Sequence, residues 1–173
     1  MQSTTAWLKK TELNLFRRIN RKRLMAFRVF SPITHLGGPI CTIGFTLIMI
    51  VMSTGSLQKV ATISLIGLAI SHIPVSIIKR TFPRIRPHQV LEEIETGENP
   101  LTDASFPSGH STAIFSVLMP FVLYYPPIGL LLVPLAISVS VSRMVLGLHY
   151  PSDCLAGALL GTVTAVSMFI LSN

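Results

Sequence analysis

Long apolar runs separated by short polar breaks dominate the chain after residue 38. The runs lie near 39–54, 59–78, 111–126, 127–142 and 154–171. Several are shorter than the ~20 residues that span a bilayer comfortably, so tilt or local thinning of the membrane is expected there. The pattern predicts an all-α integral membrane bundle of about five transmembrane helices.

The region before the first run is mixed. Over residues 3–30, apolar side chains such as Trp7, Leu15 and Phe16 are interspersed with eight lysines and arginines. This mixture predicts a basic amphipathic helix on a membrane surface; a solvated tail that sets the orientation of the protein is the alternative, and both can hold together. Pro32 and the Gly37-Gly38-Pro39 cluster are expected to end this element. The chain then forms one domain, 1–173, with a surface helix (1–30) and a bundle (39–171).

Composition agrees with a membrane location. Half of the 173 residues are hydrophobic, 12% are charged and the mean hydropathy is +0.62, which is too apolar for an ordinary soluble domain. The net charge of +7 suits anionic lipid better than nucleic acid, because no soluble basic face is present. Cys41 and Cys154 lie at or inside apolar runs and are expected to be packing residues. No cleavable signal peptide is visible.

Candidate chemistry begins with the stretch SRMVLGLHYPSD, Ser142 to Asp153. Proline is favoured at the first position of a helix, so Pro151 predicts a helix start with Asp153 in its first turn. Asp153 lies four residues after His149, close enough to hold the imidazole in one tautomer and make it a better nucleophile or base. The alternative is an interfacial histidine beside a helix-capping aspartate.

A second polar connection runs from Lys79 to Gly109. It opens with the basic sequence KRTFPRIRP, holds five of the seven acidic residues and ends in FPSGH. Two apolar runs, joined at Pro126-Pro127, separate this connection from the Ser142–Asp153 stretch. Two membrane crossings return the chain to the side it left, so the polar residues of both connections should share one face. These residues are Lys79, Arg86, Ser108, Gly109, His110, Arg143, His149 and Asp153.

The shared pocket has the chemistry of a phosphate site. Lys79, Arg86 and Arg143 supply positive charge, and the planar arginine fork matches phosphate oxygens in pairs. Ser108 and Gly109 precede a helix, where exposed N–H groups bind anions. The two histidines can take separate roles, His149 as the neutral nucleophile and His110 as the protonated acid. The basic cluster should lower the pKa of His110 and Asp153 should raise that of His149, and a bound phosphate could offset both effects.

Together these residues resemble the type-2 phosphatidic acid phosphatase (PAP2) family. Its three signatures appear in order as KRTFPRIRP, PSGH and SRMVLGLHYPSD, and the resemblance covers about residues 72–171. It implies a membrane lipid phosphate phosphatase that needs no metal or other cofactor and forms a phosphohistidine at His149. It also implies Asp153 as the orienting carboxylate and His110 as the acid. Lys79, Arg86, Ser108, Gly109 and Arg143 would hold the phosphate.

Orientation bears on the substrate. Many membrane members of this family have six spans, whereas five are counted here, which puts the N-terminus on the side of the site. That side then carries 13 of the 14 lysines and arginines, so the positive-inside rule favours a site at the cytoplasmic face of the plasma membrane. Such a site suits phosphatidylglycerol phosphate or phosphatidate, and an external site suits undecaprenyl diphosphate.

Other hypotheses remain open. The charges could form the ion path of a transporter, although they fall at the ends of runs and not at mid-membrane. The chain could bind lipid phosphate without hydrolysing it, or be a metal hydrolase that uses the two site histidines with Asp103 and Asp153. The acidic stretch 92–103 is expected to be a solvated lid or to pair with Arg80 and Arg84. His72 is expected to be hydrogen-bonded within the bundle.

Overall fold

Every regular element in the described part of the chain is helical, as expected. The computed structural model describes residues 2–20, 24–91, 94, 96 and 101–172. Its elements are α1 (Gln2–Ile19), α2 (Leu24–His35), α3 (Pro39–Met52), α4 (Gly55–Thr81), α5 (Pro87–Val90), α6 (Gly109–Tyr124), the 3₁₀ turn η1 (Pro126–Ile128), α7 (Gly129–Val145) and α8 (Pro151–Ser172).

The five predicted apolar runs correspond to α3, α4, α6, α7 and α8, with ends that differ by a few residues. Three helical segments are long and apolar enough to cross a membrane: Gly55–Thr81, Pro126–Val145 and Pro151–Ser172. The pair Ala26–His35 and Pro39–Met52, bent by 49°, can supply a fourth, and α6 is apolar but shorter. The chain is therefore a helical membrane protein.

The N-terminal region differs from the single surface helix predicted over residues 3–30. It forms two helices, α1 and α2, and Pro32 lies inside α2 instead of ending an element. Arg21, Lys22 and Arg23, predicted to belong to the surface helix, lie outside the described residues. The α1 helix also packs on protein, since Phe16 is fully buried. The sequence pattern missed this because one buried aromatic side chain changes the hydrophobic periodicity little.

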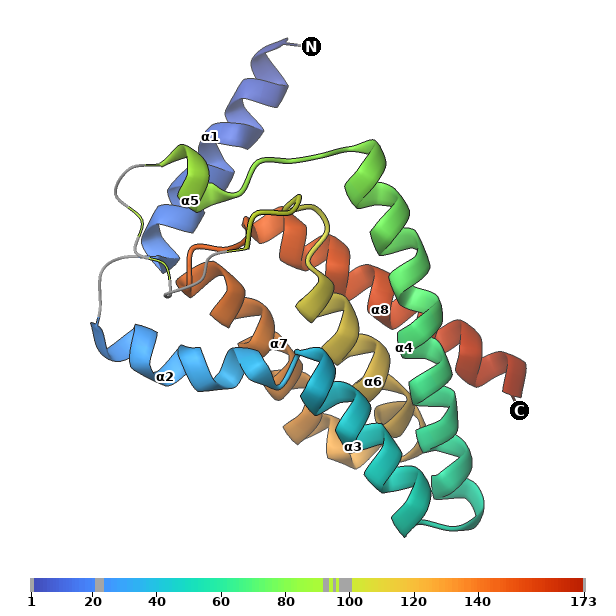
Figure 1. The fold of residues 1–173 in the computed structure, drawn as a ribbon. Coiled ribbons are helices and arrows are strands. Elements are labelled where there is room, and N and C mark those ends of the chain that lie inside the picture. Colours follow the sequence, from blue (N-terminus) through green and yellow to red (C-terminus); the bar gives the residue numbers. More distant parts are fainter. Residues whose placement is uncertain (1, 21–23, 92–93, 95, 97–100, 173) are drawn as a thin grey trace.

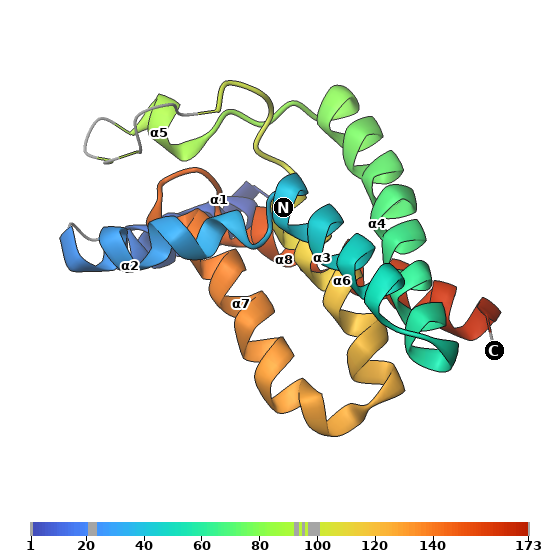
Figure 2. The same ribbon diagram turned by 60° about the horizontal axis from the view of Figure 1, so that its bottom comes forward.

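Helix α6 lies at the centre of the bundle (Figures 1 and 2), against α4 on one side, α8 on another and α7 on a third. The α3–α4 connection lies at one end of the bundle. The α5 segment and the loop before α6 lie at the other end, close to α1. Leu68, Val117 and Val139, from α4, α6 and α7, meet in the core.

Helices α6 and α8 approach each other at two glycines. A Cβ at Gly157 would lie 2.5 Å from the carbonyl oxygen of Ser108, and a Cβ at Gly161 would lie 2.4 Å from that of Thr112. Both distances are far inside van der Waals contact with backbone that cannot rotate away. This contact depends on the absence of side chains at Gly157 and Gly161.

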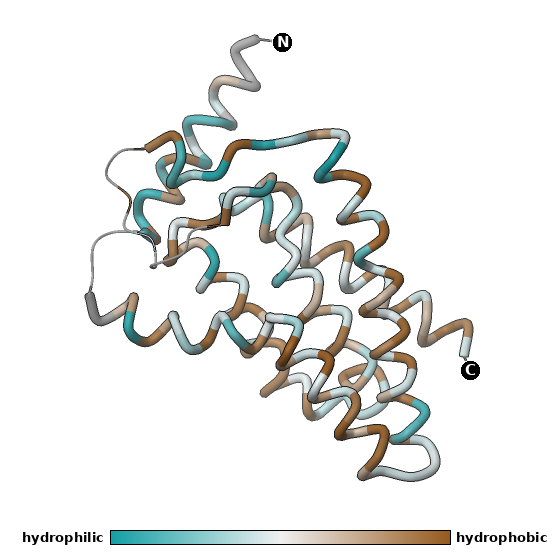
Figure 3. Tube along the Cα trace, in the orientation of Figure 1, coloured by the Kyte–Doolittle hydropathy of each residue, from teal (hydrophilic) through white to brown (hydrophobic). Residues whose placement is uncertain are grey.

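Apolar side chains also cover much of the outside of the bundle. Figure 3 shows hydrophobic residues along α3, α4, α7 and α8, and hydrophilic residues gathered towards α1 and α5. Ile40 and Leu130 are 88% and 87% exposed. Such surfaces are stable when lipid covers them. The polar end, with α1 and α5, therefore lies towards one membrane surface.

We predict that Gly161→Ala destabilises the protein, because the added methyl group must push apart the backbones of α6 and α8. Overpacking of this kind costs about 1–3 kcal/mol. The apparent melting temperature in detergent micelles should fall. Gly44→Ala is the matched control, since a Cβ at Gly44 meets nothing within 4 Å. An equal change in both variants would contradict the close contact at Gly161.

Candidate functional site

The Ser142–Asp153 stretch folds as a sharp turn between two helices. Helix α7 ends at Val145, and Gly147 follows with φ +69°, a left-handed conformation that favours glycine. The N–H groups of Leu148 and His149 then donate to the carbonyl oxygen of Arg143, at 3.0 and 3.2 Å. Helix α8 begins at Pro151, as predicted. This turn directs the His149 side chain into the protein.

Asp153 lies in the first turn of α8 and is fully buried. Its Oδ2 accepts the backbone N–H of Tyr150 at 2.9 Å and lies 3.6 Å from Nδ1 of His149. The second distance is that of an ion-pair contact and slightly too long for a hydrogen bond. Oδ1 accepts from the guanidinium of Arg84 at 2.8 Å. The carboxylate therefore faces the imidazole with one oxygen and a cation with the other.

His149 is 1% exposed, and Nη1 of Arg86 lies 3.1 Å from its Nε2. Arginine can only donate, so Nε2 is the acceptor and the proton of the neutral ring is on Nδ1, facing Asp153. Burial lowers the pKa of His149 to about 4. The positive charges of Arg143 and Arg86 lower the pKa further, whereas the Asp153 carboxylate raises it. Asp153 does raise the pKa, as expected from the sequence, but burial outweighs the carboxylate and the net direction is downward.

Arg86 is fully buried and surrounded by acceptors. Its Nε donates to the carbonyl oxygen of Asp103 at 2.8 Å, its Nη1 to that of Leu148 at 2.8 Å, and its Nη2 to Oδ1 of Asp103 at 2.7 Å. Oδ2 of Asp103 pairs with Lys79. Burial alone would raise the pKa of Asp103, but the hydrogen bonds from Lys79 and Arg86 lower it to about 2.

Asp103 has other partners than the two arginines expected for the acidic stretch. It pairs with Lys79 and Arg86, not with Arg80 or Arg84. Glu92, Glu93, Glu95 and Glu98 lie outside the described residues. Within the described part of the chain, no group of three histidine, cysteine, aspartate or glutamate side chains is arranged to hold a metal ion.

Arg143, in the last turn of α7, is also buried. Its Nη1 donates to Oγ1 of Thr34 in α2 at 2.7 Å. Its Nε and Nη2 are buried without a hydrogen-bond partner among the described residues. Burying a guanidinium whose N–H groups are not all paired is costly, and an anion that paired with Arg143 would remove that cost.

The PSGH motif forms the start of α6. The Ser108 N–H donates to the carbonyl oxygen of Asp153 at 3.0 Å, which joins the two motifs directly. Oγ of Ser108 caps the helix by accepting from Ser111. The N–H groups of Gly109 and His110 lie in the first turn, where no intrahelical acceptor exists. His110 lies within electrostatic reach of Arg143, His149 and Arg86.

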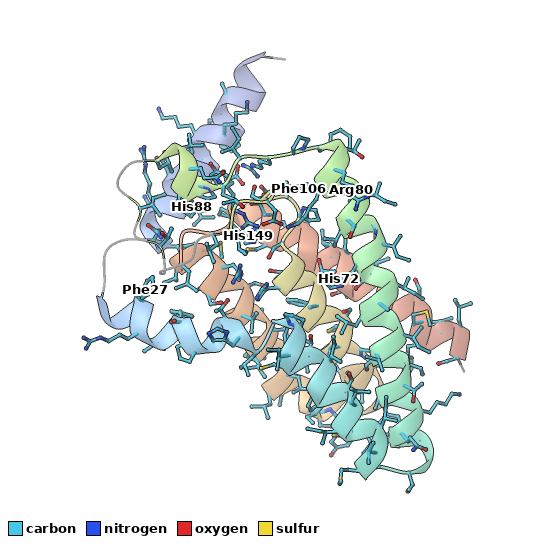
Figure 4. All side chains as sticks on the ribbon, viewed as in Figure 1. Phe27, His72, Arg80, His88, Phe106 and His149 are labelled. Carbon is cyan, nitrogen blue, oxygen red and sulfur yellow. The ribbon has the colours of Figure 1, made fainter. Side chains whose placement is uncertain are left out.

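An apolar cavity of about 440 Å³ opens beside this helix start. Residues of α3, α4 and α6 line it, including Ile43, Leu65, His72, Gly109 and His110. Figure 4 shows His149 and Phe106 near the loop end of the bundle and His72 farther along α4. His72 Nδ1 lies 2.9 Å from the carbonyl oxygen of Leu68, so His72 is hydrogen-bonded within the bundle, as expected.

Three further side chains hold the predicted residues in place. Thr34 orients Arg143, Arg84 pairs with Asp153, and Glu12 pairs with Arg84 at 2.8 Å. Two of them carry a weak signal in the sequence: Arg84 lies inside KRTFPRIRP, and Glu12 is the only acidic residue before residue 92. Thr34 carries no such signal.

The sequence of the chain matches one protein family over much of its length. The sequence profile of the PAP2 superfamily matches residues 60–173, about two thirds of the chain. The chain belongs to the PAP2 superfamily. The match includes the PAP2 residues from Lys79 to Asp153 that converge at one end of the bundle, whereas α1, α2 and α3 lie outside it.

Curated relatives agree with this family. A putative undecaprenyl-diphosphatase of Escherichia coli is 37% identical over 110 residues (61% of this chain, 54% of that protein). A bacitracin transport permease protein of Bacillus licheniformis is 43% identical over 67 residues (39% of this chain, 33% of that protein). A lipid A 1-phosphatase of Rhizobium etli is 32% identical over 95 residues (53% of this chain, 41% of that protein). The matches therefore span a third to about half of these relatives.

Two crystal structures share the PAP2 fold over most of the chain. LpxE of Aquifex aeolicus superposes with a TM-score of 0.81 and 23% identity, covering 91% of this chain and 94% of that one. The first transmembrane PAP2-type phosphatidylglycerolphosphate phosphatase from Bacillus subtilis gives 0.75 and 20%, covering 95% and 84%. These likenesses establish the fold.

The burial of His149 leads to a pH prediction. An unfolded histidine takes up a proton near pH 6.5, whereas folded His149 resists protonation until about pH 4. Its stabilising contribution is complete above pH 6.5 and lost as the pH falls through about 4. The apparent melting temperature of the wild type should therefore fall over this range, and the fall should be smaller in His149→Asn. Parallel curves for the two proteins would contradict the lowered pKa.

Proposed function

We propose that this protein is a metal-independent phosphatase that acts on phosphorylated membrane lipids through a phosphohistidine at His149. One observation carries the proposal: a buried histidine, backed by a buried aspartate, lies beside arginines of which one, Arg143, has N–H groups without a partner in the described part of the chain. A nucleophile next to cations that can pair with an anion is the arrangement that phosphoryl transfer requires.

In the proposed reaction, the Nε2 lone pair of His149 attacks phosphorus while the bond to the lipid oxygen breaks. His110 donates its proton to that oxygen, and the lipid alcohol leaves. His110, now neutral, takes a proton from water as the water oxygen attacks the phosphohistidine, which releases phosphate and restores both histidines. Asp153 stabilises the Nδ1–H side of the imidazole while Nε2 is phosphorylated.

The remaining site residues would hold the phosphate. Lys79, Arg86 and Arg143 supply charge, and the first turn of α6, with Ser108 and Gly109, supplies N–H donors. In the present structure Lys79 and Arg86 are held by Asp103, and Arg86 also donates to His149. A phosphate with two negative charges can displace one carboxylate, and Arg86 would then release the His149 lone pair for attack.

The lipid character of the substrate is supported by the apolar cavity of about 440 Å³ that adjoins His110. Its lining of apolar side chains suits hydrocarbon and not a soluble headgroup. Phosphatidylglycerol phosphate or phosphatidate is our first substrate proposal. Undecaprenyl diphosphate is the second, because the relative of 37% identity is named for that activity.

We also propose that the site faces the cytoplasm from the plasma membrane. Lys9, Lys10, Arg17 and Arg18 lie on α1, which packs at the site end of the bundle, whereas Lys59 contacts Ser172 at the far end. Positive charge concentrated at one end favours the cytoplasmic side.

We predict that His149→Ala abolishes phosphate release from phosphatidylglycerol phosphate, phosphatidate and undecaprenyl diphosphate, each presented in mixed micelles. The wild type should release phosphate from at least one of them in the presence of excess EDTA, and should form an acid-labile, alkali-stable phosphoprotein. An unchanged elution profile of the variant controls for folding. Wild-type turnover by His149→Ala would refute the nucleophile, and loss of wild-type activity in EDTA would favour a metal hydrolase. Absence of any wild-type turnover would favour a lipid-phosphate-binding protein or a transporter.

Orientation has a separate prediction. In a Cys41→Ser background, Thr102→Cys places an exposed thiol at the site end and Ser56→Cys places one at the opposite end. In intact cells, an impermeant maleimide should label Ser56→Cys and should label Thr102→Cys only after permeabilisation. The reverse pattern would put the site outside the cell.

A further inference from the structure

The chain of ionic contacts does not end at the aspartate that faces His149. Oδ1 of Asp153 accepts from Nη1 of Arg84 at 2.8 Å, on the side opposite the imidazole. The guanidinium of Arg84 also covers the ring of Tyr150, with its central carbon 3.9 Å from the ring centroid. Arg84 is thus the cation next to a fully buried carboxylate, and it stacks on Tyr150, which lies in the turn between α7 and α8.

Arg84 is held in turn by the N-terminal helix. Oε2 of Glu12 in α1 accepts from Nη2 of Arg84 at 2.8 Å. Oε1 of Glu12 accepts the backbone N–H of Ser152 at 3.2 Å and also the Ser152 hydroxyl. Ser152 is the second residue of α8, so Glu12 provides a negative charge at the positive end of the helix that carries Asp153.

A second contact fixes α1 in this position. Phe16, one turn after Glu12, is fully buried, and its ring centroid lies 5.7 Å from that of Tyr150. Asn20 adds a hydrogen bond of 2.9 Å to the carbonyl oxygen of Val145, at the end of α7. Two successive turns of α1 and the residue that follows the helix therefore contact the α7–α8 region. The cations Arg17 and Arg18 on the same helix are exposed.

We propose that Arg84 and Glu12 are positioning residues for the His149–Asp153 pair, and that α1 is therefore part of the catalytic apparatus. This inference rests on the proposed phosphatase function. Without Arg84, the Asp153 carboxylate loses the bond that keeps its other oxygen towards Nδ1 of His149. Glu12 fixes the guanidinium between Asp153 and α8.

The geometry separates this role from phosphate binding. Arg84 lies between Lys79 and Arg86 in sequence, yet its guanidinium bonds to Glu12, Ser152 and Asp153. The ammonium group of Lys79 and the guanidinium of Arg86 instead meet at Asp103. Loss of Arg84 should therefore lower kcat and leave KM nearly unchanged. Outer partners of catalytic groups are commonly worth about 10- to 100-fold.

The test compares five variants of the full chain in micelles with the wild type, using the lipid of the three above that the wild type hydrolyses. Arg84→Gln should lower kcat by about 10- to 100-fold with KM within about twofold, and Arg84→Lys should recover part of the loss. Glu12→Gln should lower kcat less. The double variant Glu12→Gln/Arg84→Gln should match Arg84→Gln alone, because Glu12 acts through Arg84. Arg80→Gln, an exposed cation in the same basic stretch, is the matched control and should behave as the wild type.

A second readout does not need turnover. In protein labelled with ¹⁵N-histidine, the wild-type His149 ring should be the neutral Nδ1–H tautomer at pH 7. Arg86 still donates to Nε2 in Arg84→Gln, so the tautomer should persist, whereas the Nδ1–H resonance should shift because Asp153 is no longer held facing it. An unchanged Nδ1–H resonance together with an unchanged kcat, or a loss confined to KM, would overturn the inference. If the wild type hydrolyses none of the lipids, the proposed function fails, and the comparison of Nδ1–H resonances still decides whether Arg84 positions His149.

Discussion

The close approach of α6 and α8 is the constraint on which the site depends. Gly157 and Gly161 let the two backbones come so near that a Cβ would lie about 2.5 Å from a carbonyl oxygen. This proximity allows the hydrogen bond of 3.0 Å from the Ser108 N–H to the carbonyl oxygen of Asp153. Two segments 45 residues apart are thereby fixed to each other through backbone, which is less mobile than any side-chain contact. Displacement of either helix would move the first turn of α6 away from His149.

The cost of burying charge explains the rest of the arrangement. Arg86, Arg143 and Asp153 are withdrawn from water at the polar end of an otherwise apolar bundle. Arg86 and Asp153 are compensated by oppositely charged groups and backbone. Among the residues that the structure describes, Arg143 has one hydrogen-bond partner, Thr34, and two nitrogens with none. Compensation is therefore uneven, and the deficit lies near His149. A bound anion would pair with the Arg143 guanidinium and remove this cost of burial, which would add to the free energy of anion binding.

The topology of the bundle could be predicted from the sequence. The five apolar runs, the turn at Pro126-Pro127 and the helix start at Pro151 all follow from local pattern, and two crossings between the polar connections require a common face. The pattern could not give the pKa direction of His149, because burial depends on how the helices dock. It also could not give the partners of Asp103, which depend on the path of a loop. The division of residues 3–30 into two helices was missed because cations and apolar residues alternate throughout that region.

The contacts of the N-terminal helices define how far the functional unit extends. The family match begins at residue 60, yet two groups that hold side chains of the candidate site come from before it: Thr34 in α2 holds Arg143, and Glu12 in α1 holds Arg84. Both approach the site from outside the bundle core, and both act on groups that the signatures do contain. A family signature specifies residue types, whereas the orientation of those side chains depends on the neighbouring groups that hold them. In this chain some of those groups come from helices outside the family match. Differences among relatives in their N-terminal helices can therefore change how the same signature residues are oriented.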